Sequence, residues 1–77
     1  NPFNPSTLIQ ISSNGDIETS LHIFDKNGKL VDTLMDQNFI TGINTYQWNA
    51  STFPSGIYIA RLSSGSMNRS IKMLLVK

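Results

Sequence analysis

The chain has 77 residues, of which 39% are hydrophobic, and its six basic and five acidic side chains leave a formal net charge of +1. A chain of this length forms one small domain, and because it has no cysteine, neither disulfides nor thiolate metal sites can stabilise it. Its basic residues are scattered, which argues against a nucleic-acid partner, and no apolar run reaches the roughly 18 residues that a membrane span requires.

Short apolar segments separated by turn signals run along the first half of the chain, a pattern typical of an all-β sandwich or barrel. We expect a first strand over residues 7–12, ended by a turn at 14–15. Apolar and polar residues alternate over 17–23, which predicts a second, half-buried strand. Residues 25–28 then predict a hairpin turn, because asparagine and glycine tolerate positive φ.

The return strand is expected over residues 30–35, where the apolar residues do not alternate cleanly, so a β-bulge or a strand covered on both faces is predicted. Residues 39–42 are expected to be a connection, and 49–56 a corner rich in turn-forming residues. Further strands are expected over 42–48, 57–62 and 67–76. The count is six strands, or seven if residues 36–41 contribute a short one.

Two aromatic residues are candidates for structural roles. Gly56 followed by Tyr58 has the spacing of a tyrosine corner, in which the hydroxyl bonds back across the preceding loop; the alternative is a simple glycine turn before an edge tyrosine. Trp48 is expected to fill the core. Its alternative role is an exposed platform with Tyr46, on the same side of one strand, that stacks on sugar rings.

Catalysis has little support in the sequence. His22 is the only histidine, so no histidine metal cluster can form, and we expect it at the surface. Residues 25–28 resemble the start of a calcium loop, but the glycine stands at position four instead of six, so an EF-hand is excluded. No Gly-x-Ser-x-Gly elbow is present. We therefore expect neither enzymatic activity nor a cofactor or bound metal.

The C-terminal residues 70–77 form a strongly apolar, strand-like run. Most domain ends fray unless something holds them, so this run is expected to lie in a sheet or to be bound by a partner. Our hypothesis is that a partner recognises it by adding a strand, with pockets for alternate side chains. The alternative is a purely structural strand whose flanking lysines discourage aggregation. The residues in question are Lys72, Met73, Leu74, Leu75, Val76 and Lys77.

Five segments, in this order and spacing, resemble the type A C-terminal sorting domain of the type-nine secretion system, found at the ends of secreted proteins of the Bacteroidetes and related phyla. They are residues 1–7, 23–31, 42–49, 54–62 and 72–77. The positions that match the family motifs, and that we expect to be structural, are Pro2, Phe3, Asn4, Pro5, Gly28, Trp48, Gly56 and Tyr58.

The resemblance implies a small immunoglobulin-like antiparallel β-sandwich without a disulfide. It also implies a secretion signal: after export to the periplasm, an outer-membrane translocon recognises the domain and moves the upstream passenger to the cell surface or medium, where a sorting peptidase usually removes the domain. Residues 1–77 are then expected to be the sorting domain of a longer secreted protein. The alternative function is an immunoglobulin-like accessory or weak carbohydrate-binding module of a secreted polysaccharide-degrading enzyme.

Overall fold

Five β-strands make up the regular structure of the protein in the computed structural model, which describes residues 2–3 and 6–77, with the backbone alone at 2–3 and 14–16. The strands are β1 (Pro2–Phe3), β2 (Ser6–Asp25), β3 (Leu30–Asn49), β4 (Gly56–Ser64) and β5 (Met67–Leu75). They form one sheet in the order β1-β5-β4-β2-β3, in which every pair is antiparallel except the parallel pair β1–β5. The all-β prediction is confirmed.

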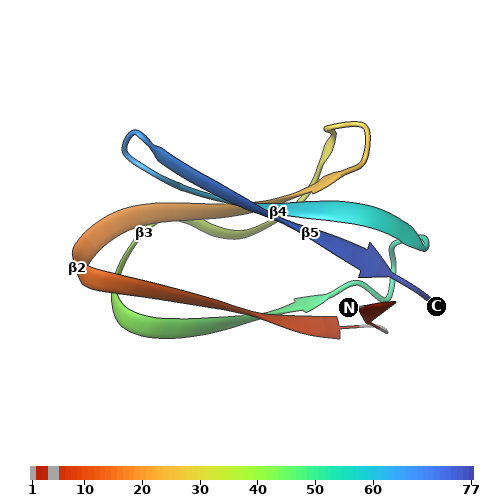
Figure 1. Cartoon of the computed structure of the whole chain (residues 1–77), viewed down its shortest axis with the longest axis horizontal. Coiled ribbons are helices and arrows are strands. Elements are labelled where there is room, and N and C mark those ends of the chain that lie inside the picture. Colours follow the sequence, from red (N-terminus) through yellow and green to blue (C-terminus); the bar gives the residue numbers. More distant parts are fainter. Residues whose placement is uncertain (1, 4–5) are drawn as a thin grey trace.

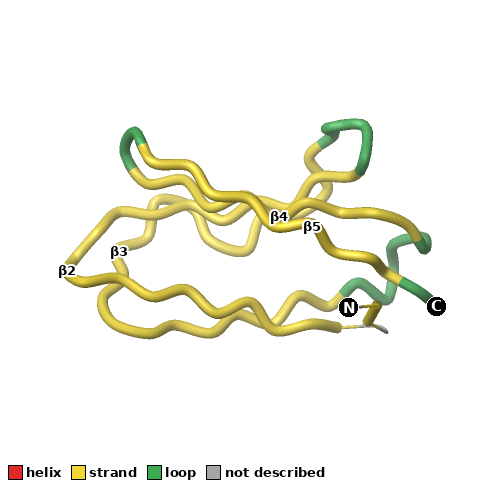
Figure 2. The backbone as a smooth tube through the Cα atoms, viewed as in Figure 1, coloured by secondary structure: helices red, strands yellow, loops and turns green. Residues whose placement is uncertain are grey.

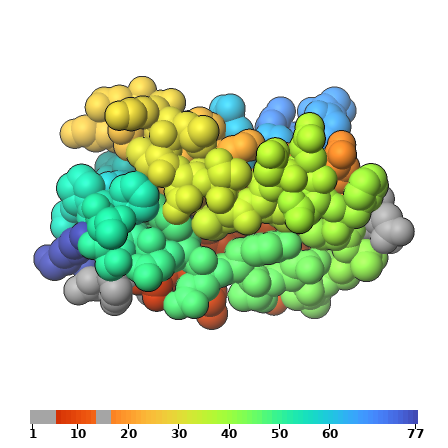
Figure 3. Space-filling model, turned by 180° about the vertical axis from the view of Figure 1, so that it is seen from behind, coloured from red at the N-terminus to blue at the C-terminus, as the bar shows by residue number. Residues whose placement is uncertain are grey.

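The sheet folds over on itself because β2 and β3 are long and both bend at the same end of the molecule (Figures 1 and 2). The lower layer pairs residues 6–13 of β2 with 42–49 of β3. The upper layer contains the rest of β2 and β3 together with β4 and β5. Seen from behind, the side chains of β3 cover much of the surface (Figure 3).

The bend corrects two predictions. Residues 14–15 do not end a strand, and residues 39–42 are not a connection, because β2 and β3 continue through both segments. The ladder pairs Ser13 with Gly42 and resumes at Ile17 with Ile40, so β2 contributes extra residues there and both strands curve instead of turning back. Gly42 has φ 70°, which glycine adopts without steric cost. The described residues thus form one curled sheet, and the sandwich of six to seven strands is not confirmed.

The turn between β2 and β3 is the predicted hairpin. The Asp25 carboxylate accepts hydrogen bonds from the backbone N–H groups of Asn27 and Lys29, at 2.9 and 3.0 Å. Gly28 has φ 84°, a left-handed conformation that a residue with a β-carbon adopts only with strain. These bonds fix the register at the start of β3.

The irregular apolar pattern at the start of β3 comes from bulges, one of the two predicted possibilities. Two residues of β3, Leu34 and Val31, have no partner in β2, because the residues on either side of each one pair with consecutive residues of β2. Both residues pack against the core. A further irregularity follows at Gln37, which has φ 53° and donates its backbone N–H to the Ser20 hydroxyl.

The core lies between the layers and centres on aromatic rings. Trp48 is fully buried, and its ring centroid is 5.7 Å from that of Phe53 and 5.3 Å from that of Tyr58. The Trp48 indole Nε1 donates to the Asp32 carboxylate at 3.0 Å, so its one polar group is satisfied. Trp48 is therefore the core residue that the sequence predicts, and it cannot serve as an exposed sugar platform. His22, expected at the surface, is half-buried.

Candidate recognition site

The loop before β4 is held by the predicted tyrosine corner. Gly56 begins β4, and the buried Tyr58 donates its hydroxyl to the carbonyl of Pro54 at 2.6 Å. Ala60 is also buried, at the position where antibody-type domains place a cysteine. The loop between β3 and β4 is thereby fixed beside the end of β5, because the register pairs Gly56 with Leu75.

Tyr58 predicts a stability change at alkaline pH. Burial, and secondly the negative charge of Asp25, raise the pKa of Tyr58 above its ordinary value. Above about pH 10 the unfolded chain loses this proton while the folded chain keeps it, so stability falls as the pH rises through the folded pKa. We expect Tyr58→Phe to cost about 1 kcal/mol at neutral pH and to flatten this alkaline decline in urea titrations.

The matched control for this prediction is Tyr46→Phe, which removes the other tyrosine hydroxyl and leaves Tyr58 in place. This variant should keep the alkaline decline. An unchanged decline in Tyr58→Phe would show that another group causes it.

The C-terminal strand divides the predicted recognition residues into two sets. Met73 and Leu75 point inward and are buried in the core, with 8% and 0% of their surface exposed. Lys72, Leu74 and Val76 alternate with them and are exposed, as the period of a strand requires. Only the exposed set can touch a partner while the domain stays folded.

Lys77 is exposed but anchored. Its backbone N–H donates to the Ser55 hydroxyl at 3.1 Å, and its ammonium donates to the carbonyl of Ser51. Both partners lie in the loop that the tyrosine corner holds. The end of the chain therefore packs along the domain, in agreement with the expectation that the apolar run lies in a sheet.

The backbone of β5 is paired on one side along its whole length, from Gly56–Leu75 to Ser64–Met67. On its other side, β1 pairs only with Leu74 and Leu75. Within the described residues, the unpaired edge thus runs from Met67 to Met73. Strand addition, the predicted mode of recognition, therefore has no free backbone at Leu74 and Leu75, because β1 already occupies that edge.

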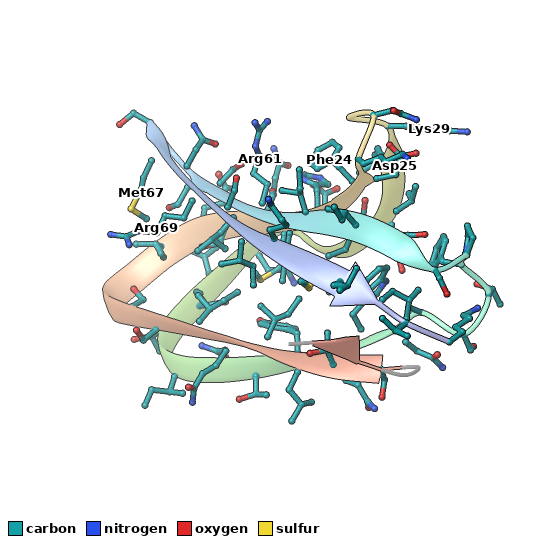
Figure 4. All side chains as sticks on the ribbon, turned by 45° about the vertical axis from the view of Figure 1, so that its right-hand side comes forward. Phe24, Asp25, Lys29, Arg61, Met67 and Arg69 are labelled. Atoms are coloured by element: carbon teal, nitrogen blue, oxygen red, sulfur yellow. The ribbon has the colours of Figure 1, made fainter. Side chains whose placement is uncertain are left out.

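An apolar groove of about 570 Å³ lies next to this unpaired edge, between β5 and the first half of β2. Met67 and Ile71 face it from β5 and remain 41% and 52% exposed. Arg69 is the charged residue among those that line it, and Figure 4 shows Arg69 and Met67 together near the start of β5. An unpaired edge beside an apolar groove is the geometry that strand addition uses.

The remaining family-motif positions lie away from this edge or outside the described part of the chain. Pro2 and Phe3 form β1, opposite Leu74 and Leu75. Asn4 and Pro5 lie outside the described residues. Sequence patterns alone missed the outward residues of the neighbouring strands, such as Ile59 beside Lys72, although the alternation along residues 57–61 could have indicated them.

Neither a metal-binding cluster nor a helix long enough to cross a membrane is found in the described part of the chain. Residues 6–13 and 17–77, whose side chains the structure describes, contain no group of three or more His, Cys, Asp or Glu placed to hold a metal. They also form no helix that could cross a membrane. The fold is a small all-β domain, and its candidate site is the unpaired edge of β5 with the groove beside it.

The comparisons with known proteins identify the family. The family described as "Secretion system C-terminal sorting domain" matches residues 1–77, and the chain belongs to it. The protein is a C-terminal sorting signal for type IX secretion, a family of signals and not of enzymes, which implies an upstream passenger and export to the cell surface or medium. No curated protein and no solved structure gives a significant match.

Proposed function

We propose that the outer-membrane translocon recognises this sorting signal through β5, without catalysis by the domain itself, after passage of the chain through the periplasm. The observation that carries the proposal is the unpaired edge of Met67–Met73 beside an apolar groove, on a domain whose family directs secretion. The two facing layers also support an immunoglobulin-like arrangement of the strands.

Recognition by strand addition suits this edge. A partner strand would satisfy the free N–H and C=O groups of β5, which supplies affinity without depending on side chains. Its alternate side chains would enter the groove and contact Ile71 and Met67. A sorting peptidase would then act upstream of the folded domain, which needs no reactive group of its own.

The test fuses residues 1–77 to the C-terminus of a fluorescent passenger with a periplasmic export signal, in a bacterium that has the type-nine system. Delivery is measured as fluorescence at the cell surface and in the medium. The wild-type fusion should be delivered, and the same fusion in a translocon-deficient strain should accumulate in the periplasm. Periplasmic retention of the wild-type fusion in both strains would refute the sorting role.

Inward-pointing lysines test the edge itself, since such charges block strand addition. Met67→Lys and Ile71→Lys place an ammonium in the groove at positions that are already partly exposed, so we expect folded domains with delivery reduced about tenfold. The matched controls Thr41→Lys and Thr45→Lys add the same charge at exposed positions of β3, which is not paired with β5, and should be delivered normally. Equal delivery of both pairs would refute recognition at this edge.

A further inference from the structure

The outward face of the upper layer carries a contiguous group of apolar side chains that the core does not use. The register places Leu30 and Ile59 on either side of Phe24, and Leu74 beside Ile57 on the neighbouring row. Side chains of directly paired residues lie on the same face of a sheet, so this group crosses all four strands of the layer. We call these five residues and the two cations Arg61 and Lys72 the outward face.

Exposure of these apolar residues is considerable. Leu30, Leu74 and Ile57 retain 50%, 44% and 38% of their surface in contact with solvent. Phe24 and Ile59 between them are half-buried. Single exposed apolar residues need no explanation, but a connected group of this kind on a small domain marks a contact surface.

Both cations of the outward face lie at the border of the apolar group. Lys72 pairs with Ile59 in the register. The Arg61 guanidinium carbon stands 5.5 Å from the centre of the Phe24 ring, so the ring holds the cation at the surface. Figure 4 shows Arg61 and Phe24 close together on the side of the upper layer that faces away from the lower layer.

No carboxylate of the described residues neutralises these cations. Among the side chains of residues 6–13 and 17–77, no carboxylate forms an ion pair with Arg61 or Lys72. The nearest acidic residue along β2, Asp25, uses its carboxylate to accept the backbone N–H groups of Asn27 and Lys29 in the hairpin. The outward face therefore offers two unpaired positive charges beside apolar surface, which a partner with carboxylates around an apolar contact would complement.

We infer that the outward face is a second docking surface of the sorting signal, and that its partner is a protein surface presenting carboxylates around apolar side chains. The inference rests on the proposed function, because that partner would belong to the machinery that recognises the domain. A second copy docked through the same face does not fit, since it would bring like charges together. An anionic membrane is attracted by clusters of about four to eight basic residues, whereas this face offers two.

Charge reversal tests the inference. In the passenger fusion, Arg61→Glu combined with Lys72→Glu should lower delivery about tenfold or more and leave the fusion in the periplasm. The matched control is Lys26→Glu combined with Lys29→Glu, which changes the net charge equally at the exposed hairpin and should be delivered normally. Lys29 lies at the hairpin end of the layer, away from Arg61 (Figure 4).

Two measurements on the purified domains separate the possible outcomes. Urea unfolding of each double variant must give a cooperative transition, and if the outward variant does not fold, Arg61→Gln with Lys72→Gln replaces it. Sedimentation with vesicles of 30% phosphatidylglycerol tests lipid as the ligand, and vesicle binding lost on charge reversal would overturn a protein partner. Equal delivery of the outward variant and the hairpin control would overturn the inference, whereas failure of the wild-type fusion would refute the sorting role itself.

Discussion

Trp48→Ala is expected to destabilise the domain severely, so that it unfolds at a much lower urea concentration than the wild type. The substitution removes a fully buried aromatic side chain that contacts Phe53 and Tyr58, and such losses cost about 3 to 5 kcal/mol. A domain of 77 residues has a total stability of roughly 4 to 12 kcal/mol, so this cost is a large fraction of it. Far-UV circular dichroism with urea titration measures the effect.

Trp48→Phe provides the graded control. It keeps an aromatic ring in the core but removes the indole N–H that the Asp32 carboxylate accepts, at an expected cost of about 1 to 3 kcal/mol. The order of stability should therefore be wild type, then Trp48→Phe, then Trp48→Ala. If Trp48→Ala unfolded at the same urea concentration as the wild type, the aromatic cluster would not be the centre of the core.

Leu75→Ala is expected to lower the stability of the domain, whereas the adjacent substitution Leu74→Ala is expected to lower its delivery and leave its stability almost unchanged. Leu75 is fully buried, so its truncation should cost about 2 to 5 kcal/mol. Leu74 is 44% exposed, so its truncation should change stability by about 0.5 kcal/mol or less. In the delivery assay, Leu74→Ala should reduce surface fluorescence although the domain remains folded, because Leu74 belongs to the outward face.

Both the stability and the delivery of each of the two variants must be measured, because each variant is expected to change them differently. If Leu74→Ala keeps both, this position does not contribute to recognition. If Leu75→Ala keeps its stability, the C-terminal strand is not bound into the core as the structure indicates. Delivery of Leu75→Ala should also recover in part at lower growth temperature, since its defect arises from folding.

Local signals in the sequence predicted those parts of the fold that depend on neighbouring residues. The hairpin at Gly28, the corner at Tyr58 and the buried position of Trp48 each follow from residue types at fixed spacing. The bend of β2 and β3 could not be predicted in the same way, because Asn14–Gly15 favours a turn whether the chain reverses or curves. The continuous ladder on both sides of the bend, a tertiary feature, decided the outcome.

In the candidate site, too, local sequence patterns predicted some features, while others depend on the tertiary structure. The period of a strand puts Met73 and Leu75 on one side of residues 71–76 and Lys72 and Leu74 on the other, and the structure buries the first pair and exposes the second. Which residues lie beside them depends on the register with β4 and β2, which the sequence alone does not contain. The partial cover of the β5 edge by β1 likewise joins segments from opposite ends of the chain, so no local pattern predicted it.

The parallel pairing of β1 with β5 brings the two ends of the chain together at one end of the molecule (Figure 1). Under the proposed function, a passenger would pull on this domain from the N-terminal side, while a translocon bound to β5 would pull the other way. Because the two strands run in the same direction, such tension loads their hydrogen bonds in shear, all at once, instead of opening them one by one. Because this pairing covers only two residues of each strand, the resistance to stretching that it adds is confined to the junction of the two chain ends.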